Sequence, residues 1–185
     1  MAKSLFSEEG STAVLEKRPK SKLQLIPQKF QTEPSPKETV FWNRYDIVLA
    51  CQPDARDNYS LYDSIVDLVK NKKKLRIYSP HDDIKRRKDL AETLLFTNKE
   101  AIPRTRGVLV HLTTITPDIQ EMFESTYKNN RPFLLFYSTG ISPFRYQDAK
   151  RIRKHPTYRG KFTYSDDAHA ISLLDLRIDK LIRTL

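Results

Sequence analysis

Three side chains with chemical potential are closely spaced between residues 118 and 127. Asp118 is followed six residues later by Glu124, and Tyr127 comes three residues after that. On an α-helix, Glu124 and Tyr127 would be neighbours, and Asp118 would lie about one and a half turns earlier. A retaining glycosyl transfer needs a carboxylate on the face of the sugar opposite the leaving group. We therefore take Glu124 as a candidate nucleophile, with Asp118 and Tyr127 as its candidate catalytic neighbours.

A simpler interpretation of Glu124 is that it belongs to a solvated flank of the same helix. Its position is roughly 130° from the middle of the apolar stripe, given about 100° per residue. Lys128 lies four residues later, where it could form an ion pair with Glu124. Spacing alone favours this interpretation, so the surroundings of the carboxylate must decide between the two.

Short apolar runs separated by helical patterns define the elements that would position these residues. The runs are typical of strands covered on both faces, and they span residues 47–51, 75–78, 107–112 and 132–137, with 162–164 as a fifth. Helices are predicted from a cap at Ser60 to Val69, over 83–96, from a cap at Thr116 onward, and from Ser165 to Leu185.

This alternation predicts a doubly wound, Rossmann-like α/β domain over residues 41–185. Its sheet would be mostly parallel, with four to five strands and helices on both faces. Ligands of such sheets bind outside the carboxyl ends of the strands. The predicted substrate-binding residues are therefore those that follow the strands, namely Gln52, Ser79, His81, Asp82, Ser138, Thr139 and Gly140.

Residues 1–40 differ from the rest of the chain in charge and in hydropathy pattern. They carry 7 basic and 5 acidic residues, a net charge of +2, whereas residues 41–185 carry 26 and 18, a net charge of +8. No sustained period runs through this first segment, and Pro34 and Pro36 favour an extended backbone. We predict a flexible basic tail, with a short strand at Leu23–Ile26 as an alternative for part of it.

Residues 45–137 resemble the nucleoside 2-deoxyribosyltransferase-like superfamily, which includes deoxynucleotide N-glycosidases. Residues 78–82 (Tyr-Ser-Pro-His-Asp) are similar to the end of the family's second strand. Residues 130–133 (Asn-Arg-Pro-Phe) are similar to its turn into a later strand, and the Asp118 to Glu124 spacing is similar to its acid–nucleophile helix. The resemblance implies an N-glycosidic bond hydrolase or deoxyribosyltransferase for nucleosides or nucleotides. Glu124 would be its nucleophile, Asp118 would bind the sugar or orient the attack, and a homo-oligomer would complete the site.

A basic stretch near residues 145–161 supports a different function, a non-catalytic module that binds a nucleotide, nucleic acid or protein. Positive charge beside tyrosines can neutralise phosphates and stack bases. The candidate nucleic-acid contacts are Lys150, Arg151, Arg153 and Lys154. The first loop after residue 51 lacks glycine where backbone would approach a ligand, which favours this alternative over an enzyme.

The cysteine, histidine and hydropathy patterns limit which kinds of metal site, disulfide and membrane segment the chain can contain. The single cysteine, Cys51, excludes a disulfide framework and a cysteine-rich zinc site, and it fits a reducing compartment. The four histidines show no metal-ligand spacing, so we predict no metal and no cofactor. His111, inside an apolar run, is expected to be a hydrogen-bonded core residue. No apolar run reaches the roughly 18 residues of a membrane span, and we predict a cytoplasmic protein.

Overall fold

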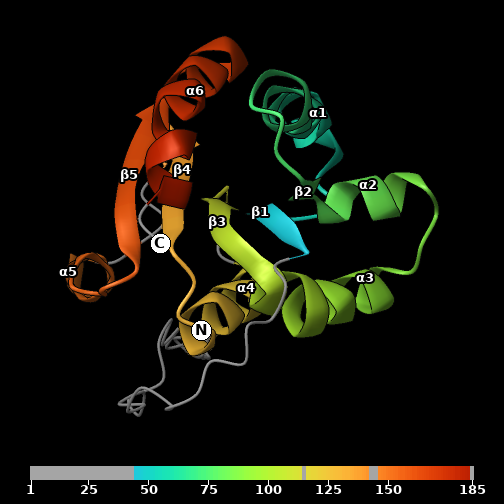
Figure 1. Cartoon of the computed structure of the whole chain (residues 1–185), viewed down its shortest axis with the longest axis horizontal. Helices are drawn as coiled ribbons and strands as arrows, with labels where there is room; N and C mark the ends of the chain where they lie inside the picture. The colour runs from blue at the N-terminus through green and yellow to red at the C-terminus, as the bar shows by residue number, and fades with distance from the viewer. Residues whose placement is uncertain (1–43, 114–115, 142–145, 184–185) are drawn as a thin grey trace, which may run out of the picture.

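A computed structural model describes residues 44–113, 116–141 and 146–183 of the chain. Five parallel strands form one sheet in the order β2-β1-β3-β4-β5 (Figure 1). The strands are β1 (Tyr45–Ala50), β2 (Ile77–Tyr78), β3 (Thr105–His111), β4 (Phe133–Ser138) and β5 (Tyr158–Tyr164). The predicted fold class is confirmed, including the fifth strand, while the predicted tail lies outside the described residues.

The two faces of the sheet are covered by different helices. Successive strand residues point to opposite faces, so Ile47 and Leu49 pack on one side while Val48 and Ala50 pack on the other. The first side is covered by α1 (Tyr59–Asp67) and α6 (Asp167–Arg183), as Figure 1 shows. The second side is covered by α4 (Pro117–Lys128), by the turns after α3 (Leu90–Phe96), and by Ile152 of α5 (Tyr146–Arg153).

Two predicted helix boundaries are wrong. The helix α1 begins at Tyr59 after Asn58, so Ser60 is not its cap. The helix predicted over 83–96 is two helices, α2 (Pro80–Lys85) and α3. The chain turns between them because Arg87 adopts a left-handed backbone with φ of 63°, and the Asp89 carboxylate then caps α3 by accepting from the Glu92 amide at 3.0 Å. Because of this break, α3 buries a different set of side chains from the one that a continuous helix over 83–96 would bury.

One continuous helix over 83–96 would bury Ile84, Ala91, Leu94 and Leu95 on its apolar face. The change of face is clearest at two of these positions. Leu95 is 59% exposed, and Ala91 is also exposed.

The helix α4 begins as predicted and fixes the candidate catalytic residues. The Thr116 hydroxyl accepts from the Ile119 amide at 3.4 Å, and Pro117 occupies the first turn. Ile119, Met122 and Phe123 are buried against the sheet. The helix therefore starts at the carboxyl end of β3 and runs back along the sheet. None of the described helices combines the length and hydrophobicity that crossing a membrane would require.

Candidate functional site

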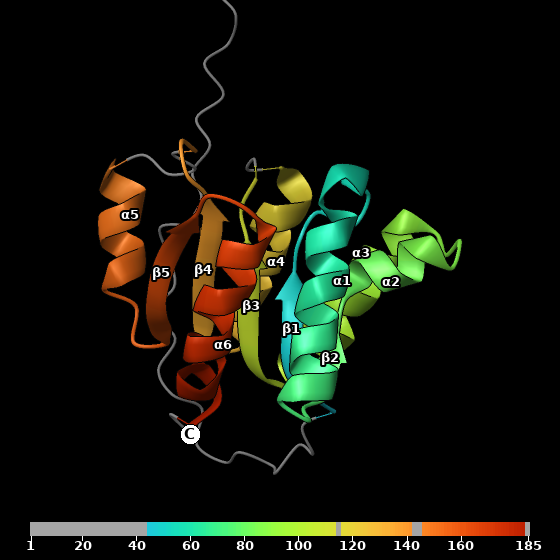
Figure 2. The same ribbon diagram turned by 90° about the horizontal axis from the view of Figure 1, so that it is seen from above.

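The predicted ligand-binding edge carries the ends of all five strands and the start of α4. Because the strands are parallel, their carboxyl ends share one edge of the sheet, seen with the strands side by side in Figure 2. Asp118 lies in the first turn of α4 at this edge and is half-buried. Gln52 follows β1 at the same edge and is also half-buried. The structure thus places a carboxylate and an amide where a ligand is expected.

Glu124 lies in the middle of α4 and is half-buried. Its Oε1 atom accepts a hydrogen bond from Gln120 Nε2 at 3.2 Å. In the part of the chain that the structure describes, this carboxylate is hydrogen-bonded to Gln120 and forms no ion pair with Lys128. Gln120 is a candidate functional residue that the sequence analysis missed, although a glutamine four residues before a glutamate on a helix was a usable signal.

Asp118 and Glu124 are separated along and around the helix. Six residues correspond to roughly 9 Å along the axis and roughly 120° around it. The two carboxylates therefore cannot share one proton, and they are suited to different parts of a ligand. This separation favours one attacking carboxylate and one that binds a hydroxyl group.

Tyr127 is placed away from the edge where Asp118 lies. Its ring packs on Phe123, Phe133 and His155, with ring centroids 5.0, 5.3 and 4.2 Å away. Phe133 is the first residue of β4, so this aromatic cluster lies toward the amino end of the strands. The Tyr127 hydroxyl is buried with no hydrogen-bond partner among the described residues, and burial raises its pKa. The structure therefore does not join this hydroxyl to Glu124.

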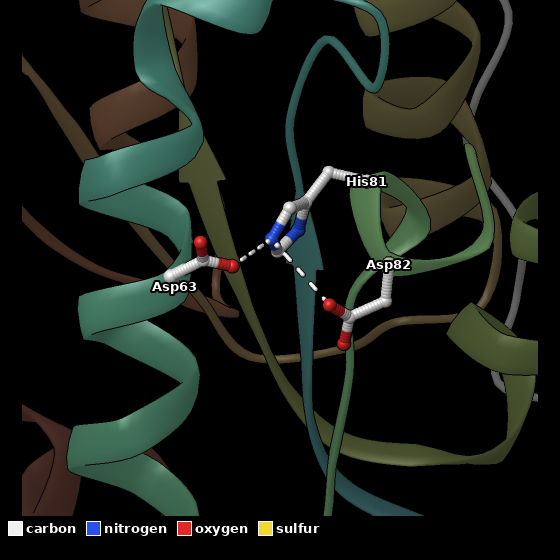
Figure 3. A group of neighbouring side chains, drawn as sticks. All are labelled: Asp63, His81 and Asp82. Atoms are coloured by element: carbon white, nitrogen blue, oxygen red, sulfur yellow. Dashed lines mark hydrogen bonds and ion pairs between the residues drawn. The ribbon is translucent and has the colours of Figure 1, made fainter. Parts of the chain in front are cut away.

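The end of β2 gathers a hydrogen-bonded group that includes three predicted residues. Ser79 Oγ lies 2.5 Å from His81 Nδ1, and His81 Nε2 lies 3.0 Å from Asp63 Oδ1 and 3.5 Å from Asp82 Oδ1 (Figure 3). The Ser79 and His81 side chains are buried, so here they organise the loop after β2. Burial also raises the pKa of the neighbouring Cys51 thiol, which keeps it protonated.

Asp63 ties this group to α1. Lys85 Nζ lies 2.7 Å from both of its carboxylate oxygens. Burial opposes the charge of Asp63, but the hydrogen bonds from Lys85 and His81 outweigh it and lower its pKa. Asp63 was not predicted as a site residue, since it precedes His81 by 18 residues and no motif links the two.

A second buried network confirms the prediction for His111. Its Nδ1 lies 3.0 Å from the Tyr62 hydroxyl, and its Nε2 lies 2.7 Å from the Tyr164 hydroxyl. Burial lowers the pKa of His111 to about 4, so the ring is neutral near pH 7. A neutral imidazole has one donor and one acceptor nitrogen, which matches one tyrosine on each side. The network joins α1, β3 and β5 below the candidate site.

The last residue of β4 and the loop after it hold the remaining predicted ligand residues. The Thr139 amide and hydroxyl donate to the Tyr164 carbonyl at 2.7 and 2.9 Å. Gly140, with φ of 92°, is exposed beside them, and Ser138 is half-buried. Three strand spacings separate β2 from β4, roughly 14 Å in all. The two groups of predicted residues are therefore at one edge but not in contact.

The basic residues lie on a different part of the surface. Lys150, Arg151, Arg153 and Lys154 are all exposed, at the end of α5 and just after it.

A hollow of about 880 Å³ lies between α1 and α6, and four of its lining residues are acidic, namely Asp63, Asp67, Asp167 and Asp175. A smaller hollow of about 590 Å³ includes Arg44 and Arg76.

Comparisons with known proteins identify the fold and leave the family open. No protein-family model and no curated protein sequence matches the chain. Among solved structures, the chain is similar to the CMP N-glycosidase BcmB of Clostridium botulinum, with a TM-score of 0.53 and 9% identity over 70% of this chain and 97% of that one. A conserved protein from Enterococcus faecalis V583 is similar at a TM-score of 0.46 and 13% identity, over 71% and 97% of the two chains. At 9% identity, the similarity to BcmB shows that the two chains share a fold.

Proposed function

We propose that this chain is an N-glycosidic bond enzyme that acts on a nucleoside or nucleotide, with Glu124 as its nucleophile. The observation that supports the proposal is the placement of this carboxylate: it is half-buried on the helix that starts at the predicted ligand-binding edge, and it accepts a hydrogen bond from Gln120. The fold shared with the CMP N-glycosidase supports the same class of reaction. The resemblance to the nucleoside 2-deoxyribosyltransferase-like superfamily gives Glu124 the same role.

The reaction would follow the two steps of retaining glycosyl transfer. The Glu124 carboxylate attacks the anomeric carbon, the bond to the base breaks, and the base leaves with the bonding electrons and takes up a proton. Water, or a second base, then attacks the glycosyl ester and regenerates the carboxylate. Asp118 would bind a sugar hydroxyl, because it lies too far along the helix to attack the same carbon.

The remaining predicted residues would position or bind the ligand. Gln52, Ser138, Thr139 and Gly140 are accessible at the strand ends and would contact the base or a phosphate. Ser79, His81 and Asp82 would hold the loop after β2, and Tyr127 would anchor the second half of α4 through its ring contacts. Ser79, His81 and Tyr127 would thus be positioning residues. Asp82 is partly exposed, and its exposed part would also contact the ligand.

The proposal is tested by incubating the full chain with deoxyribonucleosides, ribonucleosides and their monophosphates, including CMP. Chromatography should detect free base from at least one of them. Glu124→Gln should lower the rate about a thousandfold or more, because a nucleophile cannot be replaced by an amide. The matched control is Glu121→Gln, an exposed position on the same helix, which should keep the activity.

A positioning role for Gln120 predicts a separate kinetic signature. Gln120→Ala should lower kcat with little change in KM, since it orients the nucleophile without binding the substrate. Base release from none of the substrates would contradict the proposed function, as would equal activity of the Glu124→Gln protein.

The exposed basic end of α5 supports a second candidate function, a non-catalytic module for nucleic acid. Four exposed cations within five residues, from Lys150 to Lys154, form a surface that phosphates can neutralise. Binding of an oligonucleotide, measured on the unchanged protein and on the Glu124→Gln protein, distinguishes the two functions. Salt-sensitive oligonucleotide binding that is unaffected by Glu124→Gln, without any base release, would favour the second candidate.

A further inference from the structure

The group at the end of β2 has the composition of a metal site and not only of an ion pair. Asp63, His81 and Asp82 each offer one ligand atom, and these atoms all lie within 4.8 Å of one another. They come from two elements, α1 and α2, and Figure 3 shows both carboxylates directed toward the His81 ring. Imidazole nitrogen with carboxylate oxygen is a donor set that binds zinc and related transition metals.

Two of the three spacings in this group are close to those between ligands of one ion. Zinc ligands lie about 2.0–2.2 Å from the metal, so two neighbouring ligands lie roughly 3.0–3.4 Å apart in octahedral or tetrahedral geometry. His81 Nε2 is 3.0 Å from the Asp63 oxygen and 3.5 Å from the Asp82 oxygen. The third pair, the two carboxylate oxygens, lies within 4.8 Å. Both carboxylates would therefore turn toward each other to bring all three atoms onto one ion.

The surroundings of His81 resemble the support of a metal-bound imidazole. Its ring is completely buried, and Ser79 Oγ contacts Nδ1 at 2.5 Å, so the ring orientation is fixed. Metal-binding histidines commonly donate their second nitrogen to such a partner. An ion would take the place of a proton on Nε2, while Nδ1 carries a proton that Ser79 Oγ accepts.

The site is open to solvent on the side of the carboxylates. The Asp63 side chain is 50% exposed and the Asp82 side chain 29% exposed, so water could complete the coordination. Asp63 also lines the hollow between α1 and α6, together with Asp67 and Asp167. Asp175 lines the same hollow, but it is ion-paired with Lys72 and Lys73. A hydrated cation would thus meet three further carboxylates beside the site, one of them already paired, although the chain as a whole carries a net charge of +10.

Lys85 would compete with a metal ion for the Asp63 carboxylate. Its ammonium group lies 2.7 Å from both Asp63 oxygens, while its side chain is 39% exposed and could move into water. The Asp82 carboxylate, in contrast, contacts His81 Nε2 at 3.5 Å and forms no ion pair with a lysine or arginine among the described residues. With a neutral His81, the group of Asp63, Asp82 and Lys85 keeps one net negative charge, and two once the lysine moves away.

We propose that Asp63, His81 and Asp82 bind a divalent transition-metal ion such as Zn²⁺, with water in the open positions and with Lys85 displaced from Asp63. This site is separate from Glu124, and its test measures binding and not base release. The outcome is therefore independent of the proposed function.

The test is titration of the metal-free full chain with Zn²⁺ by calorimetry, and with Co²⁺ by visible absorption. We expect one ion per chain and micromolar or tighter affinity for Zn²⁺. Asp82→Asn and Asp63→Asn should each weaken binding by about tenfold or more, since loss of a supporting partner alone costs 10–100-fold. Both positions are on the rim of the site, so these variants avoid the unfolding that a change of buried His81 could cause.

Two further variants separate a metal site from a structural ion pair. Asp57→Asn is the matched control, because Asp57 is an exposed aspartate on the turn just before α1, and it should change the affinity less than twofold. Lys85→Met should tighten binding several-fold, because it removes the competing ammonium group. The proposal is overturned if Zn²⁺ does not bind, or if binding survives both Asp82→Asn and Asp63→Asn.

Discussion

Three buried side chains, Tyr62, His111 and Tyr164, show how single residues hold the strands and helices together beneath the candidate site. His111 is completely enclosed, and its two ring nitrogens reach hydroxyl groups on α1 and β5. A buried imidazole is costly to protonate, because burial removes the charged ring from water. The same enclosure that organises the core therefore makes it sensitive to acid.

The pKa of His111 predicts the pH dependence of stability. It is lowered from 6.5 to about 4, so between these values the unfolded chain binds a proton that the folded chain excludes. The free energy of unfolding should therefore fall as the pH drops from 6.5 to 4, by about 3 kcal/mol from this residue. Urea denaturation at pH 7 and pH 4 measures this difference. His111→Gln should remove most of it, and an unchanged difference in that variant would contradict the assignment.

The contact between β3 and α6 shows how closely the helices approach the sheet. Gly107 of β3 has no side chain, and a Cβ atom added there would lie 2.8 Å from Leu181 Cγ of α6. Leu181 is buried, so it cannot simply turn away into water. The missing side chain at residue 107 thus sets the distance between this helix and the strand next to the candidate site.

A double-mutant cycle at this contact tests the packing. Gly107→Ala should lower the free energy of unfolding by about 1–3 kcal/mol, because the added methyl group overpacks the core. Leu181→Ala should lower it by about 2–5 kcal/mol through the cavity it leaves. In the double variant the new methyl group occupies part of that cavity, so the total cost should be smaller than the sum. Denaturation curves of the four proteins measure this coupling, and additive costs would show that the two residues do not touch.

Strands and helices differ in how well the sequence predicted them. The five strands were found because apolar runs such as 107–112 are buried on both faces, and burial dominates their composition. The break between α2 and α3 was missed, because residues 85–88 are all basic and suit a helix as well as a turn. Only the left-handed backbone of Arg87 and the cap at Asp89 end one helix and start the next.

At the scale of the whole molecule, the sequence predicted the edge of the sheet at which a residue lies more reliably than the side chains that it contacts. Parallel strands bring Gln52, Asp118 and Thr139 to one edge, as their positions after strands required. The partnership of Glu124 with Gln120 and of His81 with Asp63 was not predicted. Such contacts depend on side-chain rotamers and on helix packing, which a linear pattern does not determine. The same reason explains why Tyr127, a neighbour of Glu124 by spacing, points its ring into an aromatic cluster.

The most direct measurement is the mass of the intact chain during turnover. The enzyme is mixed with a nucleotide substrate, quenched with acid at short times, and analysed by mass spectrometry and peptide mapping. The proposed mechanism predicts a transient increase equal to one glycosyl group, located on the peptide that contains Glu124 and absent from the Glu124→Gln protein. Base release without any adduct on that peptide, or with an adduct on another residue, would contradict Glu124 as the nucleophile.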